Sequence, residues 1–127
     1  MKVSIITVCY NSASTIDDTI QSILSQDYED IEYLIIDGVS SDNTLEIANK
    51  YSAKIAIIRS EPDKGMYDAI NKGIQLCTGD IVSILNADDI YIDNKVIEEV
   101  VSKMRNENAD SLYSDLYYVA TEDTNKV

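Results

Sequence analysis

The chain has 127 residues, of which 45% are hydrophobic, and this suits one globular domain with a single core. Its net charge of −13 argues against nucleic acid or an anionic membrane as a partner of this chain by itself. Histidine is absent, so Ser-His and Cys-His nucleophiles are excluded, and any general base must be a carboxylate, a lysine or a tyrosine.

The predicted elements alternate between strand and helix from the first residues onward. Residues 3–9 form an apolar, β-branched run that indicates a buried parallel strand. A helix should begin near Ser14, because apolar residues recur at helical spacing up to Leu24. A second strand is expected at 31–36. A helix capped by Ser41-Asp42 should then run to about Tyr51, followed by a third strand at 55–58.

The second half of the chain continues this alternation. A helix is expected from Met66 to about Cys77, with Gly79 ending it, and a fourth strand at 81–85. Apolar residues at helical spacing between 97 and 104 predict another helix, and residues 111–118 a final strand. This order favours an α/β fold in which a mostly parallel, doubly wound sheet carries helices on both faces.

Sequence features also bear on the compartment. No run of about 18 apolar residues occurs, so we expect no transmembrane segment. The first residues enter an apolar strand directly, without the pattern of a signal peptide, which favours a cytoplasmic location. Cys9 and Cys77 lie in apolar segments without a CxxC or zinc spacing, and we expect both to be reduced core residues.

Polar side chains follow each predicted strand, and in a parallel sheet all four strand exits lie on one edge. The exits carry Tyr10-Asn11, Asp37, the Asp63-Lys64-Gly65 loop and Asp88-Asp89. Loops are commonly polar, which is the simplest explanation. An aromatic residue, a lysine and several acids meeting at one crevice nevertheless indicate a ligand site, because open α/β sheets bind ligands at this edge.

Among these strand exits, the sequence Asn86-Ala87-Asp88-Asp89 is the most informative about a ligand. Two carboxylates about 5 Å apart repel by roughly 3 kcal/mol at an effective dielectric constant near 20. A divalent cation would turn this repulsion into attraction, and hard oxygen ligands suit Mg²⁺ or Mn²⁺ bridging to a phosphate. The alternative is that one carboxylate caps a helix or turn while the other is solvated.

Other phosphate-binding folds do not fit the turn after the first strand. That turn reads Tyr10-Asn11-Ser12-Ala13-Ser14 and contains no glycine, so it is not the GxGxxG turn of a dinucleotide-binding fold. A Walker A loop and the acidic residues of a phosphoacceptor receiver domain are also missing. A metal bound by carboxylates is therefore the natural holder of a phosphate here.

With these residues laid out, the whole chain resembles the inverting glycosyltransferases of family 2, which have the GT-A fold. Four blocks in order carry the resemblance: residues 3–11, residues 35–44 (IIDGVSSDNT), residues 63–74 (DKGMYDAINKGI), and Thr78-Gly79-Asp80 with Leu85-Asn86-Ala87-Asp88-Asp89. The third block is similar to the branch that builds bacterial surface polysaccharides. Residues 1–127 would then form a nucleotide-sugar-binding domain.

The resemblance implies transfer of a sugar from a nucleoside-diphosphate sugar to a glycan or lipid-linked acceptor, with inversion and with Mn²⁺ or Mg²⁺. Tyr10 would stack on the nucleobase, Asp88 would lie near the ribose, and Asp89, with Asp88, would ligate the metal. The remaining nucleotide-sugar-binding positions would be Asn11, Asp37, Lys64, Gly65, Asp68 and Asn86. Tyr10 could equally be a turn tyrosine, and Lys64 and Asp68 a solvated loop charge and a first-turn helix acid.

Two departures from the family pattern affect these roles. The family often has a second acid after the second strand that faces the base, whereas this chain has Gly38. Family members usually continue with an acceptor-binding half that supplies the catalytic base. We expect this chain to be the donor-binding half of a longer enzyme that associates peripherally with the inner face of the plasma membrane, and the catalytic base remains unassigned. Two alternatives are a binding module without turnover and a plain α/β domain with capping acids.

Overall fold

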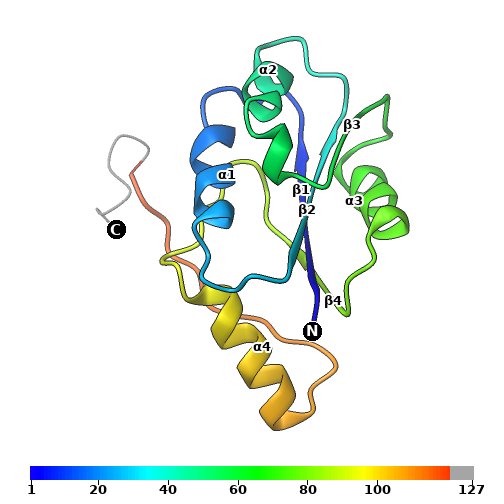
Figure 1. Ribbon diagram of the computed structural model, residues 1–127. Helices are drawn as coiled ribbons and strands as arrows, with labels where there is room; N and C mark the ends of the chain where they lie inside the picture. Colours follow the sequence, from blue (N-terminus) through cyan, green and yellow to red (C-terminus); the bar gives the residue numbers. More distant parts are fainter. Residues whose placement is uncertain (121–127) are drawn as a thin grey trace.

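Four parallel strands form the sheet of this protein, whose computed structural model describes residues 1–120 (Figure 1). The strands are β1 (Val3–Cys9), β2 (Ile31–Asp37), β3 (Ile57–Ser60) and β4 (Ile81–Ile84), and their spatial order is β3-β2-β1-β4. β1 pairs with β2 along its whole length, from Val3 opposite Ile31 to Cys9 opposite Asp37. The predicted parallel sheet is confirmed, and the carboxyl ends of its strands share one edge.

The helices cover both faces of the sheet, as expected. They are α1 (Ile16–Leu24), α2 (Thr44–Asn49), a 3₁₀ turn η1 (Ser52–Lys54), α3 (Met66–Leu76) and α4 (Val96–Glu107). Figure 1 shows α3 on one side of the sheet and α1 with α2 on the other. Buried residues of α1, α2 and α4 share one hydrophobic cluster, whereas Ala69 of α3 belongs to the cluster on the opposite face.

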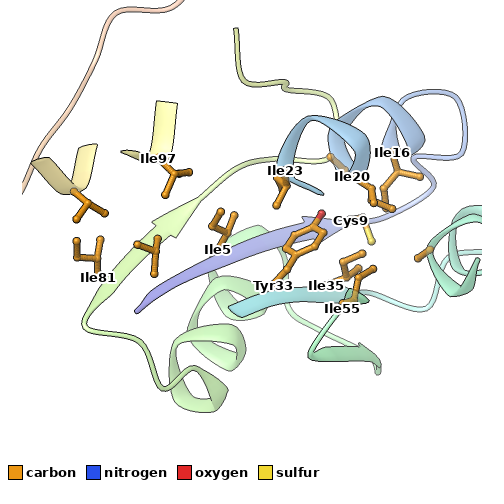
Figure 2. Close-up of a cluster of buried hydrophobic side chains, with 14 residues drawn as sticks. Ile5, Cys9, Ile16, Ile20, Ile23, Tyr33, Ile35, Ile55, Ile81 and Ile97 are labelled. Atoms are coloured by element: carbon orange, nitrogen blue, oxygen red, sulfur yellow. The ribbon is translucent and has the colours of Figure 1, made fainter. Parts of the chain in front are cut away.

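The two clusters follow the alternation of side chains along the central strands. In β1, Ile5 faces the α1 side and Ile6 the α3 side, and both are fully buried. Figure 2 shows the larger cluster, in which Tyr33 lies among isoleucines from the sheet and from α1. Its hydroxyl donates a hydrogen bond to Thr7 Oγ1 at 2.9 Å, so burial leaves this polar group satisfied.

Gly73 explains how α3 lies so close to the sheet. A Cβ added at Gly73 would come within 2.6 Å of Ile6 Cγ2, so this position of the helix accepts no side chain. The buried stripe of α3 consists of Ala69 and Gly73, and it is narrower than expected because Met66 and Ile74 are about half exposed.

Two predicted strands differ from the structure. The third strand lies at Ile57–Ser60 rather than 55–58, because its ladder with β2 begins at Leu34 opposite Ile57. The predicted strand at 111–118 is wrong: residues 111–119 are exposed and form no strand. Their apolar residues suggested β-structure, but a strand also needs a hydrogen-bonding neighbour, and within residues 1–120 they do not join the sheet.

The helix predicted to end near Tyr51 is shorter than expected and is followed by η1. The expected cap differs from the structure: the N-cap residue is Asn43, and within residues 1–120 its side chain makes no capping hydrogen bond. Asp42, one residue earlier, instead accepts a hydrogen bond from Thr44 N at 3.0 Å. Of the expected core cysteines, Cys9 is buried, Cys77 is only half-buried, and both are free thiols. Within residues 1–120, no helix is long and apolar enough to cross a membrane.

Candidate functional site

The candidate site lies where the strand order reverses, between β1 and β4. In open α/β sheets this crevice, at the carboxyl ends of the strands, is the usual ligand site. The β1–β4 ladder runs from Val3 opposite Ile81 to Ile6 opposite Ile84, so the residues after β4 leave the sheet beside the last residues of β1. Tyr10 and Asn11 follow β1, and Asn86 to Asp89 follow β4, at this reversal.

The exit of β1 is fixed to the exit of β2 by Asn11. Its side-chain Oδ1 accepts a hydrogen bond from Ser41 N at 2.8 Å, and its backbone N–H donates to Ser40 Oγ at 2.9 Å. Asn11 has a positive φ of 50°, a conformation that asparagine tolerates better than most residues. This pair of contacts holds the backbone beside Tyr10, whose side chain is 64% exposed and free to meet a ligand.

Asp37 differs from the expectation of direct ligand contact, because it is fully buried. Its carboxylate accepts hydrogen bonds from Ser40 N and Ser60 Oγ, at 3.0 and 2.8 Å, and from the hydroxyl of Ser40. Burial acts to raise the pKa of Asp37, but the hydrogen bonds from Ser40, Ser60 and Cys9 outweigh it, and the pKa lies below its usual value. Here Asp37 holds the exits of β2 and β3 together.

The buried thiol of Cys9 lies 3.4 Å from Asp37 Oδ1 and donates to it. Burial, together with the negative charge of Asp37, raises the pKa of Cys9 well above the ordinary thiol value. Cys9 is therefore a protonated hydrogen-bond donor and not a nucleophile.

Asp63 belongs to a strand exit that sequence analysis placed at this edge, but it was given no binding role of its own. A Cβ added to Gly38 would lie 2.6 Å from Asp63 Oδ2, so this carboxylate lies directly against the glycine after β2. Its other oxygen accepts a hydrogen bond from Gly65 N at 3.0 Å. The signal in the sequence was Gly38 itself, because a glycine leaves room for a side chain from a neighbouring loop.

The loop between β3 and α3 presents Lys64, Gly65 and Asp68. Asp68 Oδ2 accepts a hydrogen bond from Lys64 N at 2.9 Å, and Gly65 adopts a φ of 115° that other residues rarely adopt. Lys72, one turn further along α3, reaches back to this loop: its Nζ lies 2.6 Å from Pro62 O and 3.7 Å from Asp68 Oδ2. The side chain of Lys64 is thus carried by an ordered loop, and the residue is exposed.

Asp88 and Asp89 are exposed at the exit of β4, while Ala87 is buried beneath them. Partial burial of the carboxyl, together with the charge of Asp88, raises the pKa of Asp89 above its usual value. A cation at this position would relieve the repulsion that causes part of this shift. Next to the pair, the side-chain oxygen Oδ1 of Asn86 is buried and has no hydrogen-bond partner among residues 1–120.

These oxygen donors fit Mn²⁺ or Mg²⁺ as part of a shared coordination sphere. Two adjacent carboxylates are the hard ligands that such ions prefer. Within residues 1–120, no group of three or more acidic or thiol side chains is placed to hold a metal ion. The remaining ligands would therefore be water and the phosphates of a bound nucleotide, which is the usual arrangement for magnesium sites at phosphates.

The structure brings three of the four strand exits into direct contact, through Asn11 with Ser41 and through Asp63 with Gly38. The fourth exit, which carries Asp88 and Asp89, lies beside β1 through the β4 ladder.

Comparison with known proteins agrees with this geometry. The sequence pattern of glycosyl transferase family 2 matches residues 4–127. The chain belongs to this family. A PGL/p-HBAD biosynthesis glycosyltransferase of Mycobacterium bovis is 34% identical over 122 residues, which are 93% of this chain and 48% of that protein. WfaP of Escherichia coli, a UDP-Glc:alpha-D-GlcNAc-diphosphoundecaprenol beta-1,3-glucosyltransferase, is 34% identical over 116 residues, 91% of this chain and 46% of that protein. The chain spans about half the length of these relatives.

Similar solved structures confirm the GT-A fold. The crystal structure of residues 1–349 of S. aureus TarS in complex with UDP-GlcNAc superposes with a TM-score of 0.80 at 26% identity, covering 87% of this chain and 33% of that one. The mannosyltransferase PcManGT from Pyrobaculum calidifontis, in complex with GDP-Man and Mn²⁺, gives a TM-score of 0.76 at 25% identity, covering 81% and 32%. The expected family and fold are thus confirmed.

Proposed function

We propose that this chain binds a nucleoside-diphosphate sugar, and that the protein to which it belongs transfers the sugar, with inversion, to a glycan or lipid-linked acceptor. One observation carries the proposal: the exposed Tyr10 and the exposed pair Asp88-Asp89 flank the point where the strand order reverses. TarS with UDP-GlcNAc and PcManGT with GDP-Man support a donor of this class.

Each residue at the edge has a role in this proposal. Tyr10 stacks on the nucleobase, because an aromatic ring exposed beside a fixed backbone offers a flat apolar surface. Asn11 and Asp37 hold the loops that surround the base, and Lys64 contributes positive charge toward the diphosphate, with Gly65 and Asp68 shaping its loop. Asp88 lies near the ribose, Asn86 supports the turn, and Asp89 with Asp88 holds the metal.

The metal, Mn²⁺ or Mg²⁺, would act as a Lewis acid that stabilises the departing nucleoside diphosphate. Inversion also needs a base on the acceptor side. We place that base in the part of the protein that corresponds to the other half of the relatives, since this chain spans 46–48% of their length.

The acceptor class follows from the relatives and not from this site. WfaP is named for a diphosphoundecaprenol acceptor, and this supports a glycan or lipid-linked acceptor here. The proposed place of action is accordingly the cytoplasm, at the inner face of the plasma membrane, with peripheral association of the whole protein.

Calorimetric titration of the chain with UDP and GDP, with Mn²⁺ or with chelator, tests the donor site. We expect at least one of the two nucleotides to bind more tightly with Mn²⁺, and Asp89→Asn to remove most of that gain because a charged ligand is lost. Asp80→Asn is the matched control: this exposed aspartate lies just before β4, at the opposite end of the sheet from the site, and accepts a hydrogen bond from Lys2 N.

Equal affinity with and without metal for both nucleotides would contradict the proposed metal site. A transfer assay with the full-length protein separates the enzyme from its alternative, a nucleotide-sugar-binding module without turnover. Metal-dependent binding without any transfer to glycan or lipid-linked acceptors would favour that module.

A further inference from the structure

The segment that carries Asp88 and Asp89 is held by a polar stripe of the first helix. Residues 85–95 form no helix or strand, so contacts outside the segment must set their conformation. The stripe consists of Thr19 and Ser22, which are three positions apart and thus lie along one side of α1, together with Gln26, which follows the C-cap residue Ser25. All three bond to main-chain atoms between residues 87 and 97.

Thr19 makes the contact nearest the acid pair. Its Oγ1 lies 3.0 Å from Ala87 O and 2.7 Å from Asp89 O, so the single hydroxyl proton is shared between two carbonyls that flank Asp88, with the shorter contact to Asp89. Thr19 is fully buried and Ala87 is 5% exposed. Because water has poor access to Thr19, no solvent molecule easily replaces this hydroxyl.

Ser22 and Gln26 continue the attachment along the segment. Ser22 Oγ accepts a hydrogen bond from Tyr91 N at 3.3 Å. The Gln26 side chain donates to Asp93 O at 2.6 Å and accepts from Ile97 N at 3.1 Å, which is the second residue of α4. The stripe therefore fixes the path of the chain from the acid pair to the start of α4.

We propose that Thr19 is a positioning residue for the metal and diphosphate site. By fixing the carbonyls on both sides of Asp88, it sets the direction in which Asp88 and Asp89 project from the sheet edge. The inference rests on the proposed function, in which these carboxylates meet a metal and a nucleotide. Supports of this kind behind metal ligands typically change metal affinity by about 10- to 100-fold when removed.

The test compares Thr19→Val, which keeps the side-chain shape and removes the hydroxyl, with Thr19→Ser, which keeps the hydroxyl. Titration of UDP and GDP with Mn²⁺ and with chelator gives, for each protein, the gain in affinity that the metal provides. We expect Thr19→Val to reduce this gain about 10- to 100-fold, with little change in chelator, and Thr19→Ser to retain most of it. Hydrogen exchange of amides 88–91 in chelator should become faster in Thr19→Val alone.

Thr7→Val is the matched control, because Thr7 is also fully buried and the substitution removes the acceptor of a buried hydrogen bond, which the Tyr33 hydroxyl donates to Thr7 Oγ1. It should lower the melting temperature and leave the affinity gain from the metal unchanged.

A full affinity gain from the metal in Thr19→Val would overturn the positioning role alone. No metal gain in the unmodified chain would overturn the proposed function, and this inference with it. If Thr19→Val does not fold, Thr19→Ala, which also removes the hydroxyl, carries the test: a reduced gain supports the role of Thr19, and an unchanged gain overturns it.

Discussion

The carboxylate of Asp63 lies in the space that a side chain at Gly38 would need. A Cβ added to Gly38 would be 2.6 Å from Asp63 Oδ2, which is closer than Cβ contacts in proteins come. Gly38 follows β2 and Asp63 follows β3, so this contact joins two neighbouring strand exits.

Gly38→Ala tests this relationship. The new methyl group should displace the Asp63 carboxylate and weaken its hydrogen bond with Gly65 N, which costs about 1 kcal/mol of unfolding free energy. We expect the melting temperature to fall by roughly 3–5 °C. In an Asp63→Ala background the same substitution should be neutral or slightly stabilising, since alanine restricts the unfolded chain. Equal destabilisation in both backgrounds would contradict the steric relationship.

Asp37 predicts a pH dependence of stability. Its pKa is below the ordinary aspartate value, so the charged form stabilises the folded state. This contribution is complete above pH 3.8, the ordinary value, and is lost as the pH falls through the lower folded-state pKa. Asp37→Asn should cost about 2–3 kcal/mol at pH 7, because charge-assisted hydrogen bonds from Ser40 and Ser60 are lost.

Chemical denaturation as a function of pH measures this effect. The difference between the original chain and Asp37→Asn should be constant down to about pH 4 and then shrink. The control is Asp115→Asn, at an exposed position in 111–119, which should leave the free energy of unfolding unchanged. A difference that stays constant through acid pH would show that Asp37 is not stabilised by its charge.

Val39 is held in a strained conformation that glycine should relieve. Its φ of 63° is unfavourable for a β-branched residue, and its side chain is 52% exposed. Val39→Gly should therefore raise the free energy of unfolding by about 1 kcal/mol, after allowing for the greater freedom of glycine in the unfolded chain. Val82→Gly, on β4 with a similar exposure of 43%, should destabilise the protein instead. Destabilisation by both substitutions would exclude strain at Val39.

The main elements of this fold could be predicted because they depend on local periodicity. The apolar run of β1 and the helical spacing of α1 are both patterns within one short stretch of sequence. The acid pair after β4 was also a local signal. The same reasoning placed a strand at 111–118, since apolar residues alone do not reveal whether a neighbouring strand exists.

Contacts between distant segments could not be predicted in this way. Thr19 is buried with the apolar face of α1, but helical spacing gives no indication of its bonds to Ala87 and Asp89. Asp37 looked like a ligand contact because it follows a strand. Only the folded chain shows that Ser40 and Ser60 surround its carboxylate.

Tyr10→Ala should weaken binding of the preferred nucleotide by about 1–3 kcal/mol, the range for loss of base–aromatic stacking. Folding should be little affected, because the side chain is 64% exposed. Calorimetry with Mn²⁺ present measures the change, and Tyr10→Phe should retain most of the affinity because the ring remains. Tyr113→Ala, at a side chain that is 95% exposed, is the control. Unchanged affinity in a folded Tyr10→Ala protein would identify Tyr10 as an ordinary turn residue.

Lys72 should control the loop that carries Lys64. Its Nζ lies 2.6 Å from Pro62 O, 3.5 Å from Glu61 Oε1 and 3.7 Å from Asp68 Oδ2, and its side chain is only 22% exposed. Lys72→Met removes the charge that holds these three oxygens together. We expect nucleotide affinity to fall about tenfold, which is 1.4 kcal/mol, while Lys72→Arg keeps part of it.

A control distinguishes this role from the small effect of an ordinary surface ion pair, which is worth about 0–1 kcal/mol. Lys103 pairs with Glu107 at 3.5 Å on the exposed face of α4, so Lys103→Met removes a comparable ion pair away from the sheet edge. Titration of UDP and GDP, together with hydrogen exchange of residues 61–68, should separate the two variants. If Lys72→Met and Lys103→Met bind nucleotide equally well and the loop exchanges at the same rate in both, then Lys72 contributes only an ordinary surface ion pair.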